Sequence, residues 1–171
     1  EVKQMSAHTN TETQPTQVRE QLERSGKLSR GTNYSAAHLG ALEQLTEYPL
    51  FMPALNKTVK GKVFLKELIG TNGSEISMNK LPAGYTIPFS HAHKQNEEVY
   101  IFLKGQGQLA VDDDIVPVSE GSCVRLAPAA LRCLRNSGQE ELYFIVIQAR
   151  EGSLGQYTFD DGIKLEHNIN W

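Results

Sequence analysis

The sequence predicts an all-β protein that folds as one domain. Runs of β-branched and aromatic residues recur at intervals of roughly eight to twelve residues, as expected for short strands. Gly, Pro, Asn and Asp cluster between these runs, where they favour turns. The 171 residues contain no internal repeat and are enough to bury one hydrophobic core. This pattern is typical of a sandwich or barrel.

The first third of the chain is expected to stand apart from the regular strands. Residues 1–15 are rich in Thr, Gln, Asn and Ser and offer little to bury, which predicts a flexible tail. Residues 16–60 form an N-terminal extension. Val18 and Leu22 lie one helical repeat apart in it, and a glycine follows, so we predict a short amphipathic helix at 15–25.

The barrel is expected to span residues 61–150. Its predicted strands, each bounded by turn residues, cover 63–69, 75–81, 99–103, 108–111, 115–118, 123–126, 131–135 and 142–149. Three consecutive aspartates at 112–114 are predicted to form a solvated hairpin tip, because they lack the ligand spacing of a calcium loop. Residues 151–171 keep several aromatic and aliphatic side chains and are predicted to be a C-terminal covering segment.

Charge and composition argue against two classes of partner. The formal net charge is −3 and no basic stripe is present, so we expect no nucleic acid. No apolar run is long enough to span a bilayer, so we expect no membrane association. The two cysteines, Cys123 and Cys133, predict reduced thiols in a cytoplasmic protein. They lie on neighbouring predicted strands, so a disulfide stays open as the alternative in an oxidising compartment.

The strongest functional signal lies between Gly84 and Gly105. His91 and His93 are two residues apart, so on an extended strand both imidazoles lie on the same face. A short polar loop separates them from the paired carboxylates Glu97 and Glu98, which precede an apolar strand. Two imidazoles and a carboxylate suit one divalent transition metal, such as Zn, Fe, Mn or Ni. The simpler alternative is that both histidines lie at the surface or are satisfied by hydrogen bonds.

This stretch resembles the first conserved motif of the cupin superfamily, in which a glycine, a His-x-His pair, a glutamate and a second glycine follow at set spacings. The spacing to Gly105 fits Glu98 and not Glu97, so Glu98 is assigned as the ligand. The spacer before the histidines is one residue longer than usual. The resemblance covers residues 61–149 and implies a jelly-roll barrel of the single-domain cupin type. It also implies a homodimer, since cupins commonly pair through their sheets.

The second cupin motif lacks its histidine, which usually supplies a fourth protein ligand. Counted from Gly121 or from Asn136, the histidine position falls on Arg132. Counted from Pro128, it falls on Cys133.

Three consequences stay open. A metal held by three protein ligands keeps positions for water or substrate, with Arg132 at the pocket wall as a clamp for a carboxylate or phosphate. Alternatively, Cys133 replaces the histidine as a thiolate ligand. In the third case the site is degenerate and binds a small molecule without chemistry. Because a guanidinium repels a nearby cation, an inward Arg132 predicts an anionic ligand. Tyr100 and Phe102 share a strand face with Glu98 and are predicted to line the cavity.

From these residues we predict a metal-binding cupin with a small-molecule ligand, an enzyme if the metal is catalytic. Dioxygenases, isomerases and decarboxylases all occur in the superfamily, and nothing in the sequence selects among them. The alternative from a different class is a non-catalytic ligand-binding or sensor cupin with a structural or absent metal.

Overall fold

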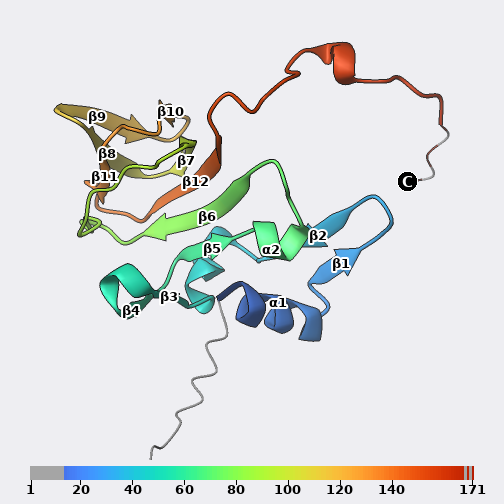
Figure 1. The fold of residues 1–171 in the computed structure, drawn as a ribbon. Helices are drawn as coiled ribbons and strands as arrows, with labels where there is room; N and C mark the ends of the chain where they lie inside the picture. The colour runs from blue at the N-terminus through green and yellow to red at the C-terminus, as the bar shows by residue number, and fades with distance from the viewer. Residues whose placement is uncertain (1–13, 168, 170) are drawn as a thin grey trace, which may run out of the picture.

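Two antiparallel sheets dominate the computed structural model, which describes residues 14–167, 169 and 171 (Figure 1). The larger sheet has the strand order β10-β7-β12-β6-β5 and the smaller one β11-β8-β9. The strands are β5 (Lys62–Phe64), β6 (Glu75–Leu81), β7 (Asn96–Lys104), β8 (Gln106–Val111), β9 (Asp114–Ser119), β10 (Cys123–Leu126), β11 (Arg132–Asn136) and β12 (Leu142–Arg150). The all-β prediction is therefore confirmed.

The main hydrophobic core draws residues from both sheets. Burial alternates along β7, so that Glu98, Tyr100 and Phe102 face the interior. The rings of Tyr100, Phe102 and Phe144 pack together with centroids 5.7 to 6.3 Å apart. Leucines and valines of both sheets complete this core: Leu109, Val118, Leu126, Leu134, Leu142 and Val146.

The N-terminal extension builds a second core under the barrel. The predicted helix is present as α1 (Gln14–Arg24), and its Val18 and Leu22 are buried. They pack in one cluster with Leu45, Tyr48, Val63 and Leu68. The rest of the extension is made of two hairpins and two 3-10 helices: β1 (Leu28–Arg30) with β2 (Ser35–Ala37), Leu42–Glu47, and β3 (Leu50–Met52) with β4 (Lys57–Val59) around Pro53–Leu55. The flexible tail predicted for 1–15 lies almost wholly outside the described residues.

The predicted strand at 63–69 is wrong beyond Phe64. The chain turns there into the short helix α2 (Lys66–Ile69), whose residues favour helix and whose Leu68 is fully buried in the second core. Gly70 ends the helix with φ 76°, a left-handed conformation that glycine adopts without strain. The aspartates at 112–114 are exposed and lie at the turn between β8 and β9, as predicted.

The C-terminal segment leaves the barrel after Arg150 instead of covering it (Figure 1). Its large apolar side chains are exposed, and Phe159 is 99% exposed. None of the described residues beyond β12 pairs in a sheet, so no backbone hydrogen-bond ladder ties the segment to its own barrel. No described helix is long and apolar enough to cross a membrane.

Replacing Phe102 by Ala is expected to lower the free energy of unfolding by about 3–5 kcal/mol, because Phe102 is 1% exposed inside the aromatic cluster. The matched control is Phe159→Ala, which removes the same atoms from an exposed ring. Urea unfolding followed by circular dichroism measures both. Equal losses in the two variants would contradict this account of the core.

Candidate functional site

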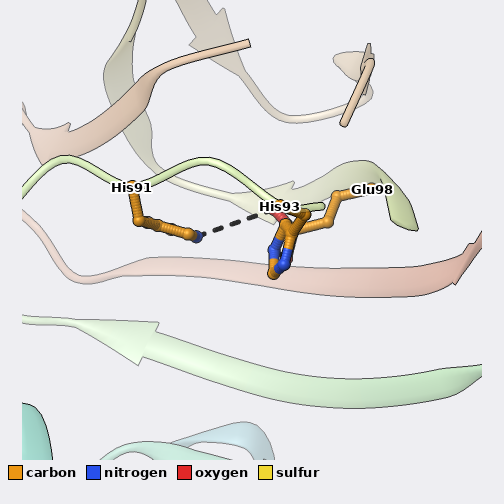
Figure 2. Close-up of side chains that lie close together, drawn as sticks. All are labelled: His91, His93 and Glu98. Atoms are coloured by element: carbon orange, nitrogen blue, oxygen red, sulfur yellow. Dashed lines mark ion pairs between the residues drawn. The ribbon is translucent and has the colours of Figure 1, made fainter. Parts of the chain in front are cut away.

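His91, His93 and Glu98 converge at one place in the barrel (Figure 2). One donor atom from each residue can be chosen so that all three lie within 4.8 Å of one another. His93 Nε2 is 3.2 Å from Glu98 Oε1, and His91 Nε2 is 4.0 Å from Glu98 Oε2. The two imidazole rings stand edge to face with centroids 5.3 Å apart. The sequence therefore identified a group of residues that the fold brings together.

Backbone hydrogen bonds fix the two histidines, although they do not lie on a regular strand. His91 and Arg132 exchange two backbone bonds, which join the histidine segment to the start of β11. The backbone N–H of His93 donates to the carbonyl of Pro128. The side-chain amide of Gln148, on β12, contacts the His93 ring at 3.1 Å. Both imidazoles are thus positioned by neighbouring parts of the barrel.

Arg132 points into the interior and pairs with the candidate metal ligand. Its side chain is 1% exposed, and its Nε donates to Glu98 Oε2 at 3.1 Å. Its Nη1 donates to the carbonyl of Ala130 at 2.8 Å. The Tyr100 hydroxyl donates to the same Glu98 oxygen at 3.3 Å. Burial, followed by the nearby Glu98 carboxylate, raises the pKa of Tyr100, so the phenol stays a neutral donor.

Cys133 and Phe102 occupy different surroundings from the three donors. The Cys133 Sγ donates to the carbonyl of Ile87 at 3.2 Å, and Cys133 is not part of the three-residue donor group. Cys133 and the exposed Cys123 are both free cysteines. Phe102 packs in the main core and does not line the cavity described below, whereas Tyr100 does. The predicted position of Phe102 on the cavity wall is therefore not observed, and Cys133 does not join the three donors.

The donor set fits a divalent metal. His91 Nε2 faces Glu98 Oε2, while the other ring nitrogen, Nδ1, is buried without a hydrogen-bond partner among the described residues. Burial, opposed by Glu98, lowers the pKa of His91 and favours the neutral imidazole, which is the form that binds metals. Two nitrogens and one carboxylate oxygen leave coordination positions open. The cation of Arg132 opposes a metal electrostatically, because both compete for Glu98.

A cavity of about 600 Å³ opens beside the three donors, within the size range of small-molecule sites. The hairpin β3–β4, strands β5 and β6, the histidine segment and parts of β7 and β12 contribute to its wall. Most of the lining is apolar. The wall also contains more lysines than glutamates: Lys57, Lys60, Lys62 and Lys80, compared with Glu98 and Glu141.

Sequence reasoning missed Lys62, which lies in this cavity wall. Its Nζ donates to Asn79 Oδ1 at 2.9 Å and to Ser77 Oγ at 3.1 Å. Burial lowers the pKa of Lys62 to about 8, and the carboxylates of Glu98 and Glu75 oppose this shift. A lysine at the start of a short strand carries no motif, so no signal in the sequence pointed to it.

Comparison with known proteins supports the fold. The family model of the cupin domain matches residues 78–148. A cupin protein from Bacteroides fragilis is 37% identical with a TM-score of 0.59, over 61% of this chain and 89% of that chain. A sugar phosphate isomerase from a cupin superfamily, from Silicibacter pomeroyi, is 19% identical with a TM-score of 0.48, over 53% and 60% of the two chains. A predicted oxalate decarboxylase from Thermotoga maritima is 24% identical with a TM-score of 0.42, over 44% and 64%. No curated protein matches the sequence.

Two antiparallel sheets around one core, with two histidines and a glutamate meeting at a cavity, define a jelly-roll barrel with a candidate metal site. The match over residues 78–148 and the 37% identity across most of the Bacteroides fragilis protein identify the family of the chain. It belongs to the cupin family.

Replacing Arg132 by Met is expected to lower the stability of the metal-free protein by about 3–5 kcal/mol, because it leaves the Glu98 carboxylate buried without its cation. Zn²⁺ should then raise the melting temperature of this variant more than that of the parent, since Glu98 no longer shares its charge with a guanidinium. Differential scanning calorimetry with and without Zn²⁺ measures both effects.

The matched control for this prediction is Arg135→Met on the same strand, because Arg135 is exposed and its side chain donates to Gln108 instead of to a carboxylate. Arg135→Met should behave like the parent in both respects. Equal responses to Zn²⁺ in the parent and in Arg132→Met would show that Arg132 does not oppose the metal.

Proposed function

We propose that this cupin binds one divalent transition metal through His91, His93 and Glu98 and uses the adjoining cavity to act on a small anionic organic molecule. The observation that carries the proposal is the convergence of the three donors on the wall of a cavity of about 600 Å³. A metal with three protein ligands and open positions is typical of catalytic rather than structural sites.

The chain's own residues support such chemistry by orienting the ligands. Arg132 and Tyr100 hold one oxygen of Glu98, which leaves Oε1 towards His93. Gln148 contacts the His93 ring from β12 and limits its rotation. When bound, the metal would act as a Lewis acid or bind dioxygen. The largely apolar wall of the cavity suits the apolar part of such a ligand.

Arg132 supports an anionic ligand. Its Nη2 is buried without a hydrogen-bond partner among the described residues. Arg132 does not line the cavity, so its charge favours an anionic ligand at a distance and not through a direct hydrogen bond. The excess of lysines over glutamates in the cavity wall favours the same sign of charge in the ligand.

One observation favours the second candidate, a non-catalytic ligand-binding or sensor cupin. The Glu98 carboxylate already has a buried cation at 3.1 Å in Arg132, so the site is charge-balanced without a metal. In this alternative the cavity recognises its ligand and the histidines contribute hydrogen bonds. As part of the proposal we also expect the protein to be a homodimer located in the cytoplasm. We expect its binding partner to be a small-molecule ligand.

Elemental analysis of the purified protein tests the metal and separates the two candidates. We expect near-stoichiometric transition metal in the parent and none in the double variant His91→Ala, His93→Ala, because two of the three donors are lost. His38→Ala is the matched control, since His38 is exposed and lies outside the donor group. Circular dichroism verifies that all three proteins are folded. A folded parent that takes up no metal, even when Zn²⁺ or Fe²⁺ is added, would contradict the proposal that the protein binds a metal. The ligand-binding alternative would then remain.

A further inference from the structure

A polar cluster lies in the larger sheet, away from the metal donors. Lys62 on β5 faces Asn79 on β6 in the strand register, and its ammonium group bonds to Asn79 and Ser77. Asn79 also donates to the Ser77 carbonyl and to the Phe144 carbonyl. Ser77 and Asn79 are 3% and 4% exposed, so the acceptors that hold Lys62 are fixed in the interior. We call Lys62, Ser77 and Asn79 the lysine cluster.

Apolar side chains also lie next to the lysine cluster. Phe64 lies under the Lys62 ammonium, 4.8 Å from Nζ to the ring centroid, and Phe144 and Val146 flank the cluster on β12. A buried polar group costs free energy unless it is fully satisfied, and apolar side chains at these inward positions would avoid that cost. The presence of a lysine and its two acceptors at these inward positions therefore points to a role in binding.

The lysine cluster and the metal donors face one cavity from different strands. Lys62 and Asn79 line its wall together with His91, His93 and Glu98. In the larger sheet, β12 separates β5 and β6 from β7, so Lys62 and Glu98 lie on different strands of the same cavity wall. Because both groups line one cavity of about 600 Å³, a single bound molecule can reach both of them.

We propose that the lysine cluster is an oxyanion subsite, at which Lys62 binds a carboxylate or phosphate group of the ligand whose other end lies at His91, His93 and Glu98. This deepens the proposed function and rests on it for the position of the reacting end. Ser77 and Asn79 hold the ammonium group in place, so its orientation is fixed before the ligand binds. The aromatic side chains of the cavity wall, Phe64, Phe89 and Phe144, suit a flat apolar body. The ligand class is therefore a compact aromatic or aliphatic oxyanion.

Binding of small probes to the full-length protein tests the subsite. The probes are benzoate, phenyl phosphate and the neutral benzamide, measured by isothermal titration calorimetry. Benzoate or phenyl phosphate should bind the parent at least about tenfold more tightly than benzamide does, because a charge-assisted hydrogen bond is lost with the neutral probe. The stronger of the two anions identifies whether the subsite takes a carboxylate or a phosphate.

Variants of Lys62 assign the effect to this residue. Lys62→Gln keeps a side-chain amide that can bond Ser77 and Asn79 but removes the charge, so anion affinity should fall at least about tenfold while benzamide affinity is unchanged. Lys62→Arg keeps the charge and should retain most of the affinity. Lys57→Gln is the matched control, because Lys57 lines the same cavity but is exposed and outside the cluster, and it should have little effect. Melting temperatures verify that each variant is folded.

Repeating the titrations after removal of metal by a chelator separates this inference from the proposed function. A Lys62 effect that persists without metal supports the subsite even if the protein proves not to be a metalloprotein. The subsite is overturned if neither anion binds the folded parent at millimolar concentration, if benzamide binds as well as the anions, or if Lys62→Gln and Lys57→Gln weaken binding equally.

Discussion

A carboxylate inside a barrel must be paired, and Glu98 is paired by a guanidinium that the same barrel buries. Arg132 Nε and the Tyr100 hydroxyl both donate to one oxygen of Glu98, while the other oxygen faces His93. Removing either charge alone would leave the other buried and uncompensated, which makes this pair a constraint on every substitution nearby. The same pair sets the chemistry of the site. It orients Glu98 for a metal and at the same time supplies a permanent positive charge that a metal must tolerate.

The alternation of side chains along β7 and the pairing of the histidine segment with β11 together bring Glu98, Arg132 and His91 close to one another. The alternation along β7 turns Glu98 and Tyr100 to the interior, and the antiparallel pairing of the histidine segment with β11 carries His91 next to Arg132. The cavity that results has a different character in different parts of its wall. Imidazoles and a carboxylate contribute to one part of its wall, a lysine held by two neutral oxygens contributes to another, and aromatic rings also line it. A cavity of this kind suits a molecule with one anionic end.

Much of this arrangement could be predicted from the sequence, because it depends on local signals. Strand periodicity predicted the all-β class, the spacing of His91 and His93 predicted that they share a face, and the resemblance to the first cupin motif implied Glu98 as the third donor. The side of β11 on which Arg132 and Cys133 lie could not be predicted, since it is set by pairing with a segment forty residues earlier. The helix α2 was missed because burial of Leu68 against the N-terminal extension, a tertiary contact, decides its conformation. Lys62 was missed because its partners come from a neighbouring strand.

The central claim is that two histidines and Glu98 hold a metal while Arg132 and Cys133 stay out of its coordination shell. X-ray absorption spectroscopy of the metal-loaded protein tests this directly, because it reports the elements bound to the metal. The account predicts nitrogen and oxygen neighbours only, at about 2.0–2.2 Å for zinc. A sulfur neighbour at about 2.3 Å would place Cys133 on the metal and contradict the account. A spectrum that is unchanged in the His91→Ala, His93→Ala variant would contradict it as well.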